Sequence, residues 1–189
     1  MTPFLNHQGI AAPFLYDNVD TDQIIPSREM KAVSKTGLAA GLFAGQRYIK
    51  GRTLNPEFVL NDPKFKAATI LLSGKNFGCG SSREHAVWAL KDFGFRAIIA
   101  CSFGEIFHNN CIRNGILPIE MNPEFIAGLP IQVSIDLPNQ TVNGTSFTFS
   151  TSDKKMLTEG LDMIGQTLAH QADIQAFFEA DKIANAWKY

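Results

Sequence analysis

The sequence predicts an α/β domain built on a parallel sheet, and three observations support this fold class. Two short apolar segments, 67–73 and 97–101, have the length and composition of buried strands. Each is followed by a segment with helical spacing that ends at a glycine, Gly94 and Gly115. A third apolar segment, 116–119, completes a strand-helix-strand-helix-strand order, which favours parallel pairing through right-handed connections.

The composition sets the broad class of protein. The 189 residues, 45% hydrophobic and 19% charged, suffice for the core of one globular domain, expected to span 1–189. The formal charge of -1 argues against a nucleic-acid partner. The sequence shows no signal-peptide pattern and no run of about eighteen apolar residues, so we expect a cytoplasmic protein without a membrane partner. Its three cysteines lack metal-like spacing, and we predict no metal site in this chain.

The N-terminal region is predicted to contain loops near the functional site. From Asn18 to Pro26, turn-forming Asn and Asp residues run into an apolar pair before proline, which predicts a loop leading to a short strand. Asp20 and Asp22 are interpreted as turn residues near the site rather than as paired catalytic carboxylates. The segment 27–51 mixes apolar residues with glycines, so we expect a mobile segment with some helix.

A glycine-rich loop and a helix start follow the first buried strand. The capping-box pattern Ser81-x-x-Glu84 predicts that the helix begins at Ser81. Gly78 and Gly80 allow a close approach of the backbone to a ligand, and the amides of a helix N-terminus favour an anion. The Arg83 guanidinium can hold a carboxylate with two hydrogen bonds. The loop therefore predicts a carboxylate-binding site at the carboxyl ends of the parallel strands.

Simpler interpretations of this loop stay open. Ser81 and Glu84 can act only as helix caps, a role that is compatible with ligand binding. A dinucleotide-binding fingerprint is disfavoured, because Arg83 stands where that fingerprint has its third glycine. Cys79 is interpreted as a filler of the tight turn rather than as a reactive or cluster-binding thiol, since no two further cysteines lie nearby in sequence.

The last third of the chain is predicted to contain strands and then helices. Segments 131–137 and 145–149 flank turn residues, so we expect antiparallel strands joined by a turn. Apolar residues at helical spacing predict C-terminal helices over about 154–183. Phe177 and Phe178 are expected to pack the last helix on the body of the domain.

Several segments of the chain resemble a known family. The segment 74–85, GKNFGCGSSREH, resembles the signature of the swivel domain of the aconitase superfamily. Three further segments, 18–26, 97–103 and 110–118, look like the small subunits of bacterial 3-isopropylmalate dehydratases. The likeness runs from about Phe14 to about Phe178. It implies a three-layer β/β/α swivelling domain in which additional antiparallel strands accompany the parallel unit.

The resemblance also implies a partner and a reaction. Subunits of this family join an iron-sulfur large subunit to form a hydro-lyase. It isomerises 2-isopropylmalate and 3-isopropylmalate, small dicarboxylic hydroxy acids, by dehydration and rehydration in leucine biosynthesis. A 4Fe-4S cluster is expected in the large subunit and none in this chain. Related small subunits for homoaconitate, citraconate or methylmalate-type acids are one alternative, and a non-catalytic swivel-fold binding module is another.

Site residues carry over from the resemblance position by position. Ser81 corresponds to the catalytic base, and Ser82, Arg83 and Gly80 correspond to substrate-binding residues. The segment 27–51 corresponds to the loop that covers the site and distinguishes substrates, and its candidates for substrate contact are Arg28, Met30 and Val33. The residues expected to shape the site are Gly78, Cys79, Asp20, Thr21, Asp22, Glu84 and His85.

Overall fold

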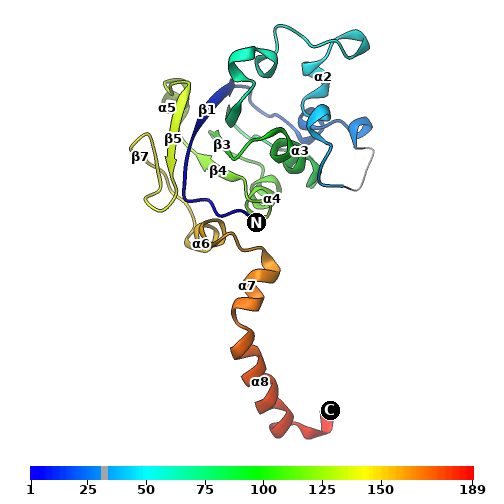
Figure 1. Ribbon diagram of the computed structural model, residues 1–189, viewed down its shortest axis with the longest axis vertical. Coiled ribbons are helices and arrows are strands. Elements are labelled where there is room, and N and C mark those ends of the chain that lie inside the picture. Colours follow the sequence, from blue (N-terminus) through cyan, green and yellow to red (C-terminus); the bar gives the residue numbers. More distant parts are fainter. Residues whose placement is uncertain (31–33) are drawn as a thin grey trace.

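The protein forms one curled mixed sheet with helices on both faces, as the computed structural model of residues 1–30 and 34–189 shows (Figure 1). Strand order in the described part of the chain is β4-β3-β2-β1-β5-β6-β7. The strands are β1 Asn6–Phe14, β2 Ala68–Ser73, β3 Ala97–Ala100, β4 Leu117–Glu120, β5 Gln132–Asp136, β6 Thr141–Val142 and β7 Thr145–Ser146.

The predicted parallel unit is confirmed. β2 pairs in parallel with β3, and β3 pairs in parallel with β4. Helix α3 (His85–Phe93) connects β2 to β3, and helix α4 (Glu105–Asn114) connects β3 to β4. Both helices end at glycines with left-handed backbone, Gly94 and Gly115, as the sequence predicts. This arrangement brings the starts of α3 and α4 to the same edge of the sheet.

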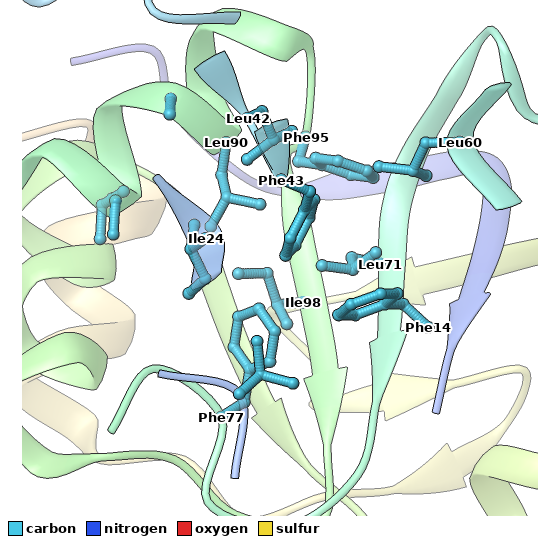
Figure 2. Packing of buried hydrophobic residues seen from close by; sticks show 14 of the residues in the cluster. Phe14, Ile24, Leu42, Phe43, Leu60, Leu71, Phe77, Leu90, Phe95 and Ile98 are labelled. Atoms are coloured by element: carbon cyan, nitrogen blue, oxygen red, sulfur yellow. The ribbon is translucent and has the colours of Figure 1, made fainter. Parts of the chain in front are cut away.

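Two apolar clusters, one on each face of the sheet, hold these elements together. Because successive side chains of a strand point to opposite faces, Leu71 and Ile98 belong to one cluster while Ile70 and Ile99 belong to the other. The first cluster packs against α3 and the segment 38–65. Figure 2 shows this packing around the strands, with contributions from Phe14, Ile24, Leu42, Phe43, Leu60, Phe77, Leu90 and Phe95.

The second cluster lies on the opposite face of the sheet. Ile126 of helix α5 (Pro123–Ala127) and Leu157 of helix α6 (Thr151–Glu159) are buried in it. Phe4, which precedes β1, is 1% exposed and joins the same cluster. The sheet is therefore covered on both faces, and β2, β3 and β4 consist mostly of apolar residues for that reason.

The N-terminal region differs from its sequence-based prediction. Strand β1 pairs in parallel with β2 and antiparallel with β5, so it occupies the centre of the sheet although no strand was predicted there. The prediction of a short strand before Pro26 is wrong. Residues Thr21–Ile24 instead form the one-turn helix α1, whose cap Asp20 accepts a hydrogen bond from the Gln23 amide at 2.7 Å. A buried apolar pair such as Ile24 and Ile25 fits either element, and the side-chain cap favours the helix.

Short helices occupy the segment between α1 and β2. They are η1 Ser27–Glu29, η2 Ala39–Gly41, α2 Ala44–Arg47, η3 Lys50–Arg52, η4 Val59–Asn61 and η5 Pro63–Phe65. The helical content predicted for 27–51 is therefore present in its described residues. Val33, a predicted substrate contact, lies outside the described residues.

The antiparallel strands near the C-terminus are arranged differently from the predicted pair. β5 pairs with β6, and β6 pairs with β7 across the turn at Asn143 and Gly144. The segment 145–149 is therefore not the direct partner of 131–137, which corrects the prediction. β6 has only two residues, and so short a strand gives no alternating pattern that sequence reasoning can detect.

The C-terminal helices extend away from the sheet. α7 (Met163–Ala169) and α8 (Gln171–Ala184), followed by η6 (Ala186–Lys188), lead away from the body (Figure 1). The expectation that the last helix packs on the body is wrong, because Phe177 is 72% exposed and Phe178 is 40% exposed. Periodicity identifies an apolar face but not the element that covers it. No helix in the described part of the chain has the length and apolar character needed to cross a membrane.

His7 gives the fold a pH dependence that can be tested. Its Nε2 lies 2.7 Å from the Thr69 hydroxyl, and burial, together with the nearby Arg96, lowers the pKa of His7 from its ordinary value of 6.5. The unfolded chain then binds the proton more readily, so stability is lost as pH falls through about 6.5. We expect the melting temperature of His7→Gln to fall less than that of the wild type between about pH 7.5 and about pH 5. Parallel melting curves for the two proteins would contradict this assignment.

Candidate active site

The glycine-rich loop at the carboxyl end of β2 is held between two backbone segments. On one side the Gly78 amide donates to the Val19 carbonyl at 2.7 Å, and the Thr21 amide donates to the Cys79 carbonyl at 3.0 Å. On the other side the backbone of residues 102–104 makes hydrogen bonds with Phe77. The loop that precedes α1 and the loop that precedes α4 therefore fix the course of the residues before Ser81.

Gly78 is required by the geometry of this loop. Its φ is +75°, and a Cβ at this position would overlap the ring of Phe107 in α4. We expect Gly78→Ala to destabilise the protein by roughly 2–4 kcal/mol, from the left-handed backbone and from overpacking. Gly144→Ala is the matched control, because Gly144 has a φ of +83° but no atom within 4 Å of such a Cβ. Equal losses of melting temperature in the two variants would show that the Phe107 contact is unimportant.

Ser81 is held by a buried threonine. Its Oγ lies 2.7 Å from Thr21 Oγ1, and its amide donates to the same oxygen at 3.3 Å. Thr21 is only 2% exposed and belongs to α1. The hydrogen bond to Thr21 restricts the orientation of the Ser81 hydroxyl. Thr21, expected only to shape the site, therefore contacts Ser81 directly.

The predicted capping box is not formed, and this corrects the expected start of the helix. α3 begins at His85, and Glu84 at its N-cap makes no side-chain cap hydrogen bond. The Ser81 hydroxyl is engaged by Thr21, while the Glu84 carboxylate accepts a hydrogen bond from Asn114 at 2.7 Å. Tertiary hydrogen bonds thus replace the local ones that the sequence pattern indicates.

Backbone amides at this helix start are available to a ligand. Within the described residues, the amides of Ser82, Arg83, Glu84 and His85 have no hydrogen-bond acceptor. Such donors, together with the positive end of the α3 dipole, favour an anion in front of the turn. The carboxylate-binding arrangement predicted from the sequence thus has donors in place, although three of the four precede α3 and only His85 belongs to it.

Arg83 is paired in this structure with Asp22. Its Nη1 donates to Asp22 Oδ1, and the two side chains are 31% and 55% exposed. Asp22 also accepts from the Ser27 hydroxyl at 3.3 Å. The Nε and Nη2 atoms of Arg83 have no acceptor among the residues that the structure describes. One edge of the guanidinium therefore remains available for a second carboxylate.

A pocket of about 250 Å³ opens beside Ser81. The glycine loop forms one wall, and the beginning of α4 forms the other. Sequence reasoning missed the four residues of this second wall, Gly104, Glu105, Ile106 and Phe107. The sequence contains only an indirect indication of these residues. Because parallel connections bring the starts of successive helices to the same edge of the sheet, the first turn of α4 could also have been expected to line the site. The lining residues are Gly78, Cys79, Gly80, Ser81, Gly104, Glu105, Ile106 and Phe107.

The other predicted residues lie farther from this pocket or support it. His85 packs its ring against Trp88, with the ring centroids 4.6 Å apart. Arg28 forms a 3.7 Å ion pair with Glu29, and Met30 packs against the first apolar cluster. In the described part of the chain, no hydrogen bond or ion pair joins Arg28 or Met30 to the Ser81 turn.

The cysteines do not form a metal site in the described residues. No three His, Cys, Asp or Glu side chains there are grouped so that they could hold a metal ion. Burial raises the pKa of the Cys111 thiol well above its ordinary value, and burial followed by the charge of Asp17 raises that of Cys101.

The fold and the site define a class of protein, which comparison with known families identifies. Residues 1–124 match the family model of the aconitase C-terminal domain. A solved structure of 3-isopropylmalate dehydratase from Methanocaldococcus jannaschii is similar, with a TM-score of 0.66 and 28% identity over 91% of this chain and 98% of that one. These matches confirm the predicted α/β fold class, a domain of the aconitase swivel type.

Curated relatives narrow the class to one family. The chain is 51% identical over 203 residues to the 3-isopropylmalate dehydratase small subunit of Cupriavidus necator, covering 99% of this chain and 98% of that protein. It is 44% identical over 200 residues to the corresponding subunit of Agrobacterium fabrum, covering 99% and 100%. The chain belongs to the family of 3-isopropylmalate dehydratase small subunits, which confirms the resemblance identified in the sequence.

Proposed function

We propose that this chain completes the active site of a two-subunit hydro-lyase that isomerises isopropylmalate, and that Ser81 is its catalytic base. The observation that carries the proposal is the position of the Ser81 hydroxyl. It lies beside a pocket, 2.7 Å from the buried Thr21 hydroxyl, and it is followed by amides that have no acceptor in the described structure. The family relationship supports the reaction, and this position of the Ser81 hydroxyl supports its proposed role as the base.

The substrate is proposed to bind through a carboxylate at the turn. The open Nε and Nη2 edge of Arg83 matches the two oxygens of a carboxylate, and Asp22 on Nη1 holds that edge in place. The Ser82 amide and hydroxyl, next to Arg83 in the chain, are proposed as further donors to this carboxylate. A dicarboxylic hydroxy acid can in this way be oriented by one carboxylate while the carbon beside it faces Ser81.

The reaction needs a proton to leave a carbon next to a carboxylate, hydroxide to depart, and water to return with its components exchanged between the two carbons. In the proposed mechanism Ser81 Oγ accepts the carbon-bound proton. A serine hydroxyl is a weak base, so its deprotonated form needs hydrogen-bond donors. The Thr21 hydroxyl, 2.7 Å from Ser81 Oγ, can serve as a donor to the deprotonated oxygen, and the positive end of the α3 dipole stabilises the same negative charge.

The 4Fe-4S cluster implied by the family is proposed to belong to the large subunit. The described residues do not fit such a group, because no three of their His, Cys, Asp or Glu side chains are grouped so that they could hold a metal ion. We therefore assign to this chain only carboxylate binding and proton transfer. A cytoplasmic location stays a prediction.

The substrate can be tested with the assembled enzyme. We expect kcat/KM of the chain with its cluster-loaded large subunit to be at least about tenfold higher for 3-isopropylmalate than for homoaconitate, citraconate or a methylmalate-type acid. A few apolar contacts to the isopropyl group are worth about 1–3 kcal/mol. A preference for one of the other acids would reassign the substrate while keeping the Ser81 chemistry. No turnover of any of them would favour the non-catalytic binding module.

A further inference from the structure

Two buried asparagines on α4 are not explained by the proposed chemistry. The buried polar or charged side chains of the described residues are Thr21, Ser73, Asn110 and Asn114. Thr21 holds Ser81, but Asn110 and Asn114 lie on α4, the neighbouring helix. Burying an amide side chain is unfavourable unless its donors and acceptors are satisfied, so the partners of these two residues indicate what they do.

Asn114 is the centre of a fully satisfied polar network. Its Nδ2 donates to Glu84 Oε1 at 2.7 Å and to the Asn110 carbonyl at 2.8 Å. Its Oδ1 accepts from the Trp88 indole at 3.1 Å, and its backbone carbonyl accepts from Lys91 Nζ at 2.6 Å. Each polar atom of the side chain therefore has a partner on α3, on α4 or at the residue before α3. A network of this kind fixes the orientation of its members.

The network reaches the turn that holds the proposed substrate-binding residues. Glu84 follows Arg83 directly and has no local capping bond, so its side chain is held by Asn114 alone among the described residues. Asn110 adds a second link, because its Nδ2 lies 3.5 Å from the Ser82 carbonyl. The residues on both sides of Arg83 are thus tied to α4.

We infer that Asn114 is a positioning residue for the turn from Ser81 to Arg83 and that it acts through Glu84. This inference rests on the proposed function of that turn. The hydrogen bond from Asn114 to Glu84 sets the backbone direction at the start of α3, and with it the direction of the unpaired amides and of Arg83. A merely structural link between α3 and α4 would affect stability but not the properties of the folded enzyme.

An exchange of partners tests this role. Asn114→Asp places a carboxylate oxygen opposite the Glu84 carboxylate and removes the donor between them. The double variant Asn114→Asp with Glu84→Gln restores one N–H···O hydrogen bond with the donor and acceptor exchanged. We expect the single variant to lower kcat/KM of the assembled enzyme by about 10–100-fold, the range of a lost hydrogen bond to a charged group. We expect the double variant to recover about tenfold of this loss.

The control and the readout separate positioning from stability. Asn109→Asp makes the same chemical change on the exposed face of α4 and is expected to keep wild-type kinetics. All assays use folded protein well below its melting temperature. A folded Asn114→Asp enzyme with wild-type kcat and KM, or a double variant without recovery, would overturn the inference. If Asn114→Asp does not fold, Trp88→Phe removes the indole donor to Asn114 together with part of the ring that packs against His85, and the inference requires this variant to lower kcat/KM several-fold.

A second readout does not depend on the reaction. Amide hydrogen exchange of residues 86–88, whose amides donate to the carbonyls of Arg83 and Glu84, is expected to accelerate in the isolated Asn114→Asp chain and to return toward the wild-type rate in the double variant. Unchanged exchange in both would overturn the positioning role even if the enzyme is active. The two proposals can also fail separately. If exchange accelerates in the single variant and recovers in the double variant, but the wild-type enzyme turns over none of the acids, the positioning role of Asn114 stands and the proposed function is wrong.

Discussion

Replacing Ser81 by alanine is expected to leave assembly with the large subunit intact and to lower kcat by about 10²–10⁴-fold, the range for loss of a positioned general base. The substitution removes one oxygen from a half-buried turn and leaves Thr21 without its 2.7 Å partner. Thr21 keeps its contact with the Ser81 amide, so the fold should tolerate the change. KM should change much less than kcat, because the carboxylate-binding groups remain.

The matched control is Ser146→Ala, which makes the same substitution at an exposed position of β7. Steady-state kinetics of both variants, with assembly checked by gel filtration, measure the difference. Thr21→Val should fall between the wild type and Ser81→Ala, since it removes the hydrogen bond to Ser81 but not the base. Near-normal turnover of an assembled Ser81→Ala enzyme would remove Ser81 from the mechanism.

Arg83→Lys is expected to raise KM by about 10–100-fold with a smaller change in kcat. Lysine keeps the positive charge and can still pair with Asp22, but it lacks the second edge that faces a substrate carboxylate. A charge-assisted hydrogen bond contributes about 1.5–3 kcal/mol, which corresponds to this range.

Arg113→Lys on α4 is the control for this change, because Arg113 is exposed and makes no ion pair among the described residues. An unchanged KM in Arg83→Lys would count against carboxylate binding by Arg83. A fall in kcat with an unchanged KM would instead indicate that Arg83 stabilises the transition state.

The parallel unit could be predicted from the sequence because its signals are local. Each buried strand is a short apolar run, and Gly94 and Gly115 mark where the helices end. β1 could not be predicted in this way, because six of its nine residues are exposed or only partly buried and its partners lie far along the chain. For α8 the reverse holds. Its helical spacing predicted the helix correctly, but the same spacing could not show that its apolar side chains, such as Phe177, are exposed.

The candidate site could be predicted as a set of residues but not as a set of contacts. The glycine loop, Ser81 and Arg83 are contiguous, so one motif identifies them. The contacts between Thr21 and Ser81 and between Asn114 and Glu84 join positions separated by 60 and 30 residues. They replaced the expected capping box because a buried tertiary partner competes successfully with a local cap at the turn.

The most direct test of the central claim is anaerobic turnover of 3-isopropylmalate by three preparations: this chain alone, a cluster-loaded large subunit alone, and the two mixed. Because the proposed base and the cluster lie on different chains, activity is expected in the mixture and in neither subunit separately. Equal activity of the large subunit with and without this chain would contradict the claim that Ser81 of this chain completes the active site.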